Sequence, residues 1–203
     1  MKIAAVTITY NRLELTKKTV ESFYSKTGVD YHLFVDNGST DGTQEYLKNY
    51  NYILFEKNYG IAHAFREAVN KLSEYDYILK LDNDIETVTD DIIGKMLRFF
   101  ELNGDQYACS PVDLNLDPAF TPATLGKGKL NEYPIKYVTH TGGAFQIAPR
   151  GICNRMCREF RHLKAGDYMI GKYYRRHGVR PVYLTDLEMR HIGINESCKN
   201  YIL

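Results

Sequence analysis

The stretch that decides the fold is YILKLDND, residues 77–84. Its apolar first part predicts a buried strand, because the strands of parallel sheets are covered on both faces. The run closes on Asp82-Asn83-Asp84, which places two carboxylates at the C-terminal end of that strand. Ligands bind at this end of the strands in open α/β sheets, and hard divalent cations prefer oxygen ligands. The stretch therefore predicts a cation site that holds a diphosphate.

The residues around this stretch alternate between strand and helix patterns. Before it, the sequence predicts strands at 3–9, 31–35 and 52–56 and helices at 13–24, 43–50 and 61–72. After it, the sequence predicts a helix at about 90–102, a long loop rich in Pro, Gly and Asn at 111–134, short strands at 137–139 and 144–147, and a last helix at 166–177. This alternation predicts an α/β fold with a twisted, mainly parallel sheet that has helices on both faces.

Length and charge limit the classes of function. The chain has 203 residues, 44% of them hydrophobic, and a formal net charge of +1. This length predicts one domain, residues 1–203, with a nucleotide-binding half at 1–100 and an acceptor and catalytic half at 101–203. The balanced charge gives no field that would attract nucleic acid or a membrane. No run of about 18 apolar residues and no leader cleavage site occurs, so we expect a cytoplasmic protein.

Polar residues also follow the other predicted strands. Thr9-Tyr10-Asn11-Arg12 follows the first strand, DNGSTDGT at 36–43 follows the second, and Asn58-Tyr59-Gly60 comes after the third. Each cluster alone is also typical of an ordinary turn. Because the carboxyl ends of parallel strands share one edge of a sheet, we expect the four clusters to gather around one ligand.

In order and spacing, these motifs resemble those of family 2 glycosyltransferases, which have the GT-A fold. The resemblance rests on residues 6–12, 35–43, 58–60 and 81–84, and it continues at 142–145, 166–167 and 175–178. It implies a hexosyltransferase-like enzyme that moves a sugar from a nucleoside diphosphate sugar to an acceptor hydroxyl with inversion. It also implies a divalent cation, Mn or Mg, and by analogy a UDP-sugar.

The resemblance implies which residues bind the nucleotide sugar. Asp36 is expected to accept a hydrogen bond from the nucleobase, and Thr9 and Tyr10 are expected to flank the base and the ribose. A planar ring and a hydrogen-bond acceptor are what a base requires, although Tyr10 could instead pack and Asp36 could cap a turn. The other donor-binding residues expected are Arg12, Asn58, Gly60, Arg66, Asp82, Asn83, Gly142 and Gly143.

The resemblance also implies a metal site. Asp84 is expected to bind the cation directly, with Asp82 reaching the ribose or a metal-bound water. His191, in Arg190-His191-Ile192-Gly193, matches a late position at which histidine completes the metal or diphosphate site. The alternatives are a solvated Asp-Asn-Asp loop and a structural histidine.

The expected catalytic base is Asp167. An inverting displacement needs a carboxylate on the acceptor side that takes the proton of the attacking hydroxyl. Asp167 corresponds to the Asp of the Glu-Asp pair in the family that the chain resembles, and Gly166 replaces the Glu. The alternative is an acidic residue in the first turn of a helix, where the helix dipole favours it.

Two other classes of function stay open at this point. A sugar nucleotidyltransferase would require a Gly-rich phosphate loop after the first strand, and residues 9–12 contain no glycine. A non-catalytic module that binds nucleotide sugars would explain Gly166, whereas Asp82, Asp84 and Asp167 argue for an enzyme. The acceptor is open among a glycan, a lipid-linked sugar, a protein and a small molecule, with modified nucleic acid disfavoured by the charge, and the oligomeric state is open as well.

Overall fold

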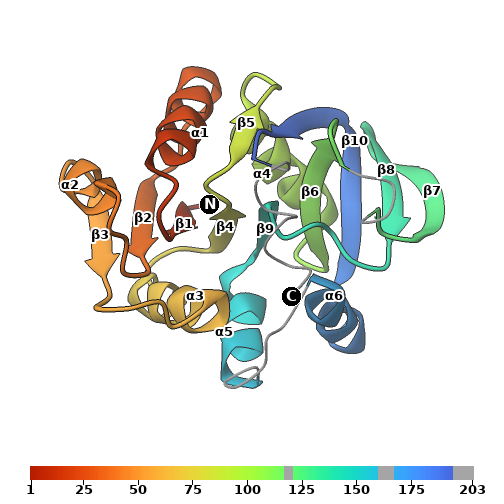
Figure 1. Ribbon diagram of the computed structural model, residues 1–203. Coiled ribbons are helices and arrows are strands. Elements are labelled where there is room, and N and C mark those ends of the chain that lie inside the picture. Colours follow the sequence, from red (N-terminus) through yellow and green to blue (C-terminus); the bar gives the residue numbers. More distant parts are fainter. Residues whose placement is uncertain (117–120, 160–166, 194–203) are drawn as a thin grey trace.

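The computed structural model of the protein describes residues 1–116, 121–159 and 167–193, without the side chains of residues 167 and 168. Its strands are β1 (Ile3–Thr9), β2 (Tyr31–Asp36), β3 (Asn51–Leu54), β4 (Tyr77–Leu81), β5 (Ile85–Thr87), β6 (Tyr107–Asp113), β7 (Thr124–Leu130), β8 (Tyr133–Val138), β9 (Phe145–Pro149) and β10 (Arg180–His191). Its helices are α1 (Leu13–Lys26), α2 (Thr43–Leu47), α3 (Ile61–Lys71), α4 (Ile92–Asn103), α5 (Arg150–Glu159) and α6 (Asp167–Arg176). Within these residues the strands form one sheet in the order β3-β2-β1-β4-β9-β6-β10-β8-β7, with β5 paired to β10 (Figure 1).

The first half of the chain forms the parallel part of the sheet. Strand β1 pairs in parallel with β2 and β4, and β2 pairs in parallel with β3. The predicted strands 3–9, 31–35 and 77–81 agree with β1, β2 and β4 to within a residue, while α2 is shorter than the predicted helix 43–50. The prediction of a mainly parallel α/β fold is confirmed.

Helices cover both faces of this sheet, and β1 shows why. Its alternate side chains point to opposite faces, as in any strand. Ile3 and Ala5 are buried in a core with the side chains of α4 and with Phe23 of α1, whereas Ala4 and Val6 are buried in a second core with α3, α5 and α6. In Figure 1, α1 and α4 accordingly lie above the sheet and α3, α5 and α6 below it. A strand buried on both faces gives the continuous apolar pattern from which it was predicted.

The second half of the chain completes the sheet mostly with antiparallel strands. Strand β9 runs antiparallel between β4 and β6, and β8 lies antiparallel to both β10 and β7. Strand β10 runs parallel to β6 and antiparallel to β5. Strands from both predicted halves of the chain therefore share one sheet, and the sequence did not predict β5, β6, β7, α5 or β10.

The prediction of a long loop at 111–134 is wrong for the part of this segment that the structure describes. Strand β6 extends to Asp113, and β7 and β8 form a hairpin at the end of the sheet. Strand β7, with the sequence TLGKGKL, is exposed along most of its length, so its residues lack the alternation of a half-buried strand. Its lysines and glycines are typical of an edge strand that is protected against pairing with other chains. Residues 117–120 lie outside the described residues.

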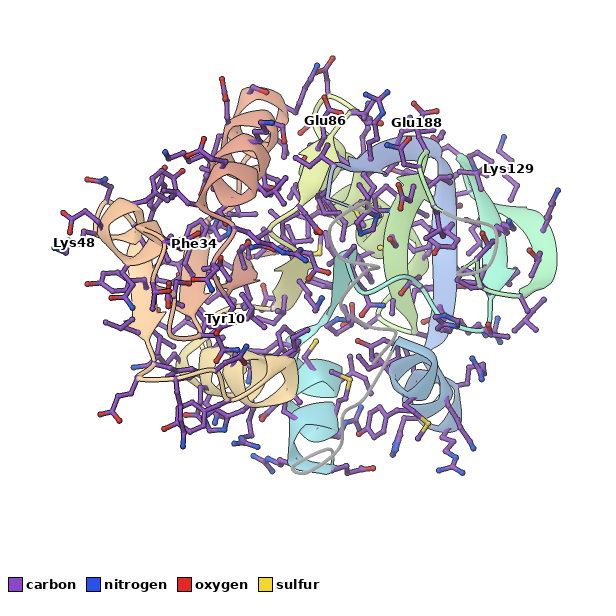
Figure 2. All side chains as sticks on the ribbon, in the orientation of Figure 1. Tyr10, Phe34, Lys48, Glu86, Lys129 and Glu188 are labelled. Carbon is purple, nitrogen blue, oxygen red and sulfur yellow. The ribbon has the colours of Figure 1, made fainter. Side chains whose placement is uncertain are left out.

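His32 is a buried titratable group in the core beneath α1. Its Nε2 lies 2.9 Å from the Thr7 hydroxyl and its Nδ1 lies 3.0 Å from the Tyr24 hydroxyl. The ring stacks on Phe34 with centroids 4.1 Å apart, and Phe34 is marked in Figure 2. Burial lowers the pKa of His32 to about 3, so the folded protein keeps this ring neutral.

We expect His32 to make the fold sensitive to acid. The unfolded chain binds a proton at this ring below its ordinary pKa of about 6.5, whereas the folded protein does not, so stability is full above that pH and falls below it. The free energy of unfolding should drop by about 2 kcal/mol between pH 7 and pH 5 from this group. Urea unfolding at the two pH values measures the drop, and the non-titrating variant His32→Gln should lose less stability over the same interval. An equal loss in both proteins would contradict the assignment.

Cys109, Cys153 and Cys157 are free and buried, and burial raises the pKa of the Cys157 thiol to about 11. Cys198 lies outside the described residues. Among the residues that are described, no helix combines the length and the apolar character needed to cross a membrane.

Candidate active site

The carboxyl ends of β1, β2 and β4 meet at one edge of the sheet. Thr9 lies opposite Asp36 in the register of β1 and β2, and the backbone N–H of Asn37 donates a 2.8 Å hydrogen bond to the Thr9 carbonyl oxygen. From the β4 side, the amide of Asn83 donates to the Thr9 hydroxyl oxygen at 3.0 Å. The structure therefore brings together the polar clusters that follow these three strands, as the sequence predicts.

Asp36, at the end of β2, has one carboxylate oxygen in use and one without a partner. Its Oδ1 accepts hydrogen bonds from the backbone N–H groups of Gly38 at 2.8 Å and Ser39 at 2.7 Å, so Asp36 does cap the turn. Its Oδ2 is buried and has no hydrogen-bond partner among the described residues. A buried acceptor without a partner costs about 1–3 kcal/mol, so an N–H group of a ligand that reached this oxygen would be stabilised.

The cluster after β3 is attached to the cluster after β2. The Asn37 side-chain oxygen accepts a 3.0 Å hydrogen bond from the backbone N–H of Tyr59. Gly38 has a φ of +86°, and a Cβ there would lie 2.7 Å from the backbone of the opposite loop, so only glycine fits. The Asn58 oxygen accepts from the Gly60 N–H at 2.9 Å at the start of α3. Asn58 and Gly60 thus shape the loop, and their contact with the donor stays a prediction.

Tyr10 and Tyr59 offer planar side chains near this edge. Tyr10 follows β1 with 47% of its surface exposed, and Figure 2 marks its position. Tyr59 is exposed to a similar extent. An exposed tyrosine ring can stack on a nucleobase while its hydroxyl stays in water. The role of Tyr10 beside the base and ribose stays a prediction.

The two carboxylates of the Asp-Asn-Asp motif are each paired with a cation of the protein. Asp82 Oδ1 accepts a hydrogen bond from Lys80 Nζ at 2.5 Å. Asp84 Oδ2 accepts a hydrogen bond from Arg12 Nη1 at 3.0 Å, and the Asp84 side chain is only 9% exposed. A carboxylate that is nearly removed from water requires such a charge partner. Each carboxylate at the end of β4 therefore has a positively charged neighbour.

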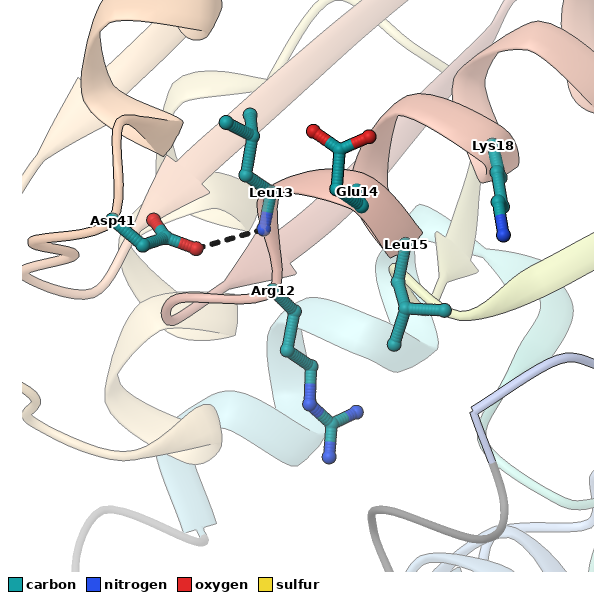
Figure 3. Close-up of a pocket in the computed structure, with 6 residues that line it drawn as sticks. All are labelled: Arg12, Leu13, Glu14, Leu15, Lys18 and Asp41. Atoms are coloured by element: carbon teal, nitrogen blue, oxygen red, sulfur yellow. Dashed lines mark hydrogen bonds between the residues drawn. The ribbon is translucent and has the colours of Figure 1, made fainter.

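Arg12 reaches Asp84 because the chain bends sharply between β1 and α1. Asn11 and Arg12 have positive φ angles of 56° and 69°, a conformation that side chains other than glycine rarely adopt. Such strained residues cluster at functional sites. A pocket of about 450 Å³ opens here, lined by Arg12, Leu13, Glu14, Leu15, Lys18 and Asp41. Figure 3 shows Arg12 and Leu15 pointing to the same side of the first turn of α1, away from Asp41.

His191, at the end of β10, lies beside Asp84. In the antiparallel pairing of β10 and β5, His191 is opposite Ile85, the residue that follows Asp84. The next backbone N–H, that of Ile192, donates a 2.9 Å hydrogen bond to the Asp84 carbonyl oxygen. The structure thus brings His191 to the Asp-Asn-Asp motif, where the resemblance to family 2 places it.

Asp113 holds the ring of His191. Its Oδ2 accepts a hydrogen bond from the ring Nδ1, and its Oδ1 lies 3.2 Å from the backbone nitrogen of the same histidine. Burial alone would lower the pKa of His191. The hydrogen bond to Asp113 and the negative charges of Asp113, Asp84 and Asp82 together raise it by more than burial lowers it, so the pKa of His191 is raised overall. Burial raises the pKa of Asp113, and the His191 contacts and a backbone hydrogen bond lower it more, so the net pKa is lowered. Both partners therefore favour their charged forms.

The glycine pair 142–143 is connected to this edge through Lys80 and Tyr183. Lys80 Nζ donates to the Gly143 carbonyl oxygen at 2.6 Å, and the Gly142 N–H donates to the Tyr183 hydroxyl at 3.1 Å. A Cβ at Gly142 would meet that hydroxyl at 3.6 Å, which is ordinary van der Waals contact. The protein itself therefore has room for a Cβ at Gly142, and close approach of a donor sugar stays a prediction.

Arg66 and Asn83 have partners within the protein. Arg66 Nη2 lies 2.7 Å from His63 Nδ1, and its Nε donates to Glu67 at 3.4 Å. Both partners are on α3, so the guanidinium group lies along the same helix that carries it. The Asn83 amide donates to the hydroxyl oxygens of Thr9 and Thr16, which ties β4 to β1 and α1. Contact of either side chain with the donor stays a prediction.

Comparison with known proteins identifies the family. The model of glycosyl transferase family 2 matches residues 4–152, which is more than half of the chain. The chain belongs to this family. The matched segment of this family 2 protein contains the strand-end clusters and the glycine pair, whereas Asp167 and His191 lie beyond it.

Several proteins of known structure share the fold. GalNAc-T7, solved with UDP, GalNAc and Mn²⁺, has a TM-score of 0.74 at 11% identity over 94% of this chain and 44% of its own. The mannosyltransferase PcManGT from Pyrobaculum calidifontis, solved with GDP-Man and Mn²⁺, has a TM-score of 0.71 at 16% identity. The match covers 94% of this chain and 56% of PcManGT. S. aureus TarS, solved with UDP-GlcNAc, has a TM-score of 0.72 at 15% identity, and the match covers 94% of this chain and 58% of the TarS chain. At these identities the likeness establishes the GT-A fold.

A curated relative is the glycosyltransferase AglJ of Haloferax volcanii. It is 36% identical over 83 residues, which are 40% of this chain and 27% of that protein. The chain thus spans about a quarter of the length of AglJ and 44–58% of the lengths of the three structures. The GT-A fold is what the three structures share with this chain.

The residues at the motif fit a divalent cation that arrives with a diphosphate. Among residues 1–116, 121–159 and 167–193, no group of three or more His, Cys, Asp or Glu side chains could hold a metal by itself. Asp84 and Asp82 offer carboxylate oxygens and His191 a ring nitrogen. Mg²⁺ usually needs one or two carboxylates, with phosphates and waters as its other ligands. This family 2 site is therefore suited to a metal shared with the nucleotide.

Asp167 opens α6, at the place where the sequence predicts the last helix. Its side chain and Gly166 lie outside the described part of the chain, so the role of Asp167 as base stays a prediction.

Two residues at the site were missed from the sequence. Asp113 ends the apolar run of β6, so the strand-end argument that found Asp36 could have found it. Gly193 approaches the motif so closely that a Cβ would lie 2.9 Å from Asp84 Oδ2 and 3.1 Å from a Leu15 methyl. The signal for Gly193 was its place directly after His191 and Ile192.

Proposed function

We propose that this family 2 protein transfers a sugar from a UDP-sugar to an acceptor hydroxyl, with inversion and with dependence on a divalent cation. The observation that carries the proposal is the position of His191 beside Asp84. His191 lies outside the segment that matches the family model, so this position comes from the fold of the second half. A carboxylate and an imidazole brought together from distant parts of the chain form a site suited to Mn²⁺ or Mg²⁺ with a diphosphate.

The donor is held by residues from each strand end. Asp84, Asp82 and His191 would hold the cation. When bound, the cation neutralises the charge that the diphosphate gains as it leaves. Arg12, now paired with Asp84, brings a second positive charge to the same place. Asp36 Oδ2 is the acceptor for an N–H group of the nucleobase.

The transfer is a single displacement. The acceptor oxygen forms a bond to the anomeric carbon of the sugar on the face opposite the diphosphate, and the bond to the diphosphate oxygen breaks with its electron pair on that oxygen. The Asp167 carboxylate takes the proton of the acceptor hydroxyl as the bond forms. Backside attack inverts the anomeric configuration. Proton NMR of the product tests this step, and retention of the donor's configuration would remove Asp167 from the role of base.

Thermal stabilisation by nucleotide sugars tests the donor proposal. We expect UDP-sugars with Mn²⁺ at about 100 times their Kd to add about 2.7 kcal/mol of stability, which raises the Tm by roughly 5–10 °C for a chain of this length. The panel should include UDP-GlcNAc, UDP-GalNAc and GDP-Man, each with Mn²⁺ and with EDTA. Stabilisation that is equal in EDTA would contradict the metal dependence. If no nucleotide sugar raises the Tm, the proposal that the donor is a nucleotide sugar is wrong.

Several features of the proposal go beyond the donor site. The acceptor stays open among a glycan, a lipid-linked sugar, a protein and a small molecule. One domain over residues 1–203 and a cytoplasmic location stay predictions. Family membership and the absence of glycine from residues 9–12 favour a transferase over a sugar nucleotidyltransferase. Turnover with any acceptor would exclude the non-catalytic module.

A further inference from the structure

Asp113, at the end of β6, has a buried carboxylate that contacts both the ring and the backbone of His191. Its side chain is 2% exposed, and its Oδ2 accepts the hydrogen bond from His191 Nδ1. Its Oδ1 accepts from the backbone N–H groups of Asn115 at 3.0 Å and His191 at 3.2 Å. The side-chain amide of Asn115 in turn donates to the His191 carbonyl oxygen at 3.0 Å. Asp113 and Asn115 therefore bind both the ring and the backbone of His191.

The hydrogen bond between His191 Nδ1 and Asp113 leaves Nε2 as the ring nitrogen that can bind a ligand. A histidine that donates Nδ1–H to a carboxylate has, when the ring is neutral, its lone pair on Nε2. Nε2 is on the side of the ring away from Nδ1, and no partner for it is found among the described residues. The ring is 19% exposed, so a small ligand can reach it. Asp84 lies beside the same histidine through the β5–β10 pairing.

We propose that Asp113 is a positioning residue that holds His191 with Nε2 presented to the divalent cation at Asp84. The inference rests on the proposed function, because it assigns a purpose to Asp113 within that site. Partners of this kind fix the orientation and the tautomer of a metal-binding histidine. Asp113 touches neither the cation nor the donor in this proposal, and it acts through His191 alone.

A purely structural role for Asp113 can be separated from this one by a neighbouring ion pair. Arg190 and Glu86 form a 2.9 Å pair between β10 and β5, one residue away from His191, with both side chains about 40% exposed. That pair ties the same end of β10 to the sheet without touching the ring of His191. If Asp113 only fastened β10, its loss and the loss of Glu86 should have similar consequences.

The experiment compares Asp113→Ala, Asp113→Asn and the control Glu86→Gln. Mn²⁺ binding is measured by EPR in the presence of saturating UDP. We expect Asp113→Ala to weaken Mn²⁺ binding about 10–100-fold, Asp113→Asn to weaken it less because it keeps an oxygen acceptor, and Glu86→Gln to leave it unchanged. Circular dichroism melting confirms that each variant is folded before titration, and Asp113→Asn serves alone if the alanine variant does not fold.

A second readout needs neither metal nor turnover. In protein with ¹⁵N-labelled histidine, spectra in alkaline buffer should assign the His191 proton to Nδ1 in the wild type and partly to Nε2 in Asp113→Ala. Unchanged Mn²⁺ affinity or an unchanged tautomer in that variant, with Mn²⁺ bound normally by the wild type, would overturn the role of Asp113. No Mn²⁺ binding by the wild type in the presence of UDP would instead overturn the proposed function, and with it this inference.

Discussion

Replacing Asp84 with asparagine should reduce kcat/KM for sugar transfer by about 10³-fold. Asparagine keeps the shape of the side chain but removes the negative charge that a divalent cation requires, and the stabilisation supplied by such a cation amounts to several kcal/mol. The loss should appear in a transfer assay with Mn²⁺ at saturating concentration. The increase in Tm caused by a UDP-sugar with Mn²⁺ should shrink in the same variant.

The controls for this variant come from the same chain. Asp82→Asn should lose less activity than Asp84→Asn, because Asp84 is the residue proposed to bind the cation directly, whereas Asp82 is proposed to reach the ribose or a metal-bound water. Glu45→Gln removes an exposed acidic partner of Lys48 on α2, which has no proposed part in metal binding, and should leave transfer unchanged. An Asp84→Asn protein with wild-type activity would rule out Asp84 as a metal ligand, and a greater loss for Asp82→Asn would reverse the ranking of the two carboxylates.

Replacing Asp167 with asparagine should reduce kcat by about 10²–10⁴-fold, the usual contribution of a general base. Asparagine cannot take the proton of the acceptor hydroxyl, yet it leaves the nucleotide site at the strand ends untouched. Donor binding should therefore persist. Steady-state kinetics give the loss of turnover, and thermal stabilisation by a UDP-sugar with Mn²⁺ shows that the donor still binds.

Asp186→Asn is the matched control for Asp167→Asn, because Asp186 is an exposed acidic residue on β10. It should keep full turnover. If Asp167→Asn also keeps full turnover, the base lies elsewhere. If the variant loses donor binding together with turnover, Asp167 serves the nucleotide site and the proposed division between donor and acceptor residues is wrong.

Strands β1, β2 and β4 of the parallel half could be predicted from the sequence because they are buried on both faces. Ile3–Thr9 and Tyr77–Leu81 are nearly continuous apolar runs, the pattern typical of strands in a parallel sheet. Strand β10 could not be predicted in this way. Its pairing with β6 shifts register between Leu184 and Glu188, and polar residues interrupt its pattern. Its position depends on the tertiary contacts with β5, β6 and β8 rather than on local preference.

Site residues that follow predicted strands could be found from the sequence, whereas those on strands that were not predicted could not be found by the same argument. Asp36, Asp82 and Asp84 follow predicted strands, so the strand-end argument found them. His191 came only from the resemblance to family 2, because β10 was not predicted. Asp113 was missed because β6 was not predicted and residues from 111 onward were expected to form a loop.

The unpartnered oxygen of Asp36 has a consequence for nucleobase selection. A carboxylate oxygen can only accept a hydrogen bond, so it favours uracil and guanine, which carry a proton on the ring nitrogen of their pairing edge. Cytosine and adenine carry a lone pair at the equivalent nitrogen, and their donor on that edge is the exocyclic amino group beside it. In the orientation that places the ring nitrogen against Asp36 Oδ2, this lone pair would face a carboxylate oxygen and repel it. Cytidine and adenosine diphosphate sugars should therefore bind more weakly than their uridine and guanosine counterparts in that orientation, for an electrostatic reason.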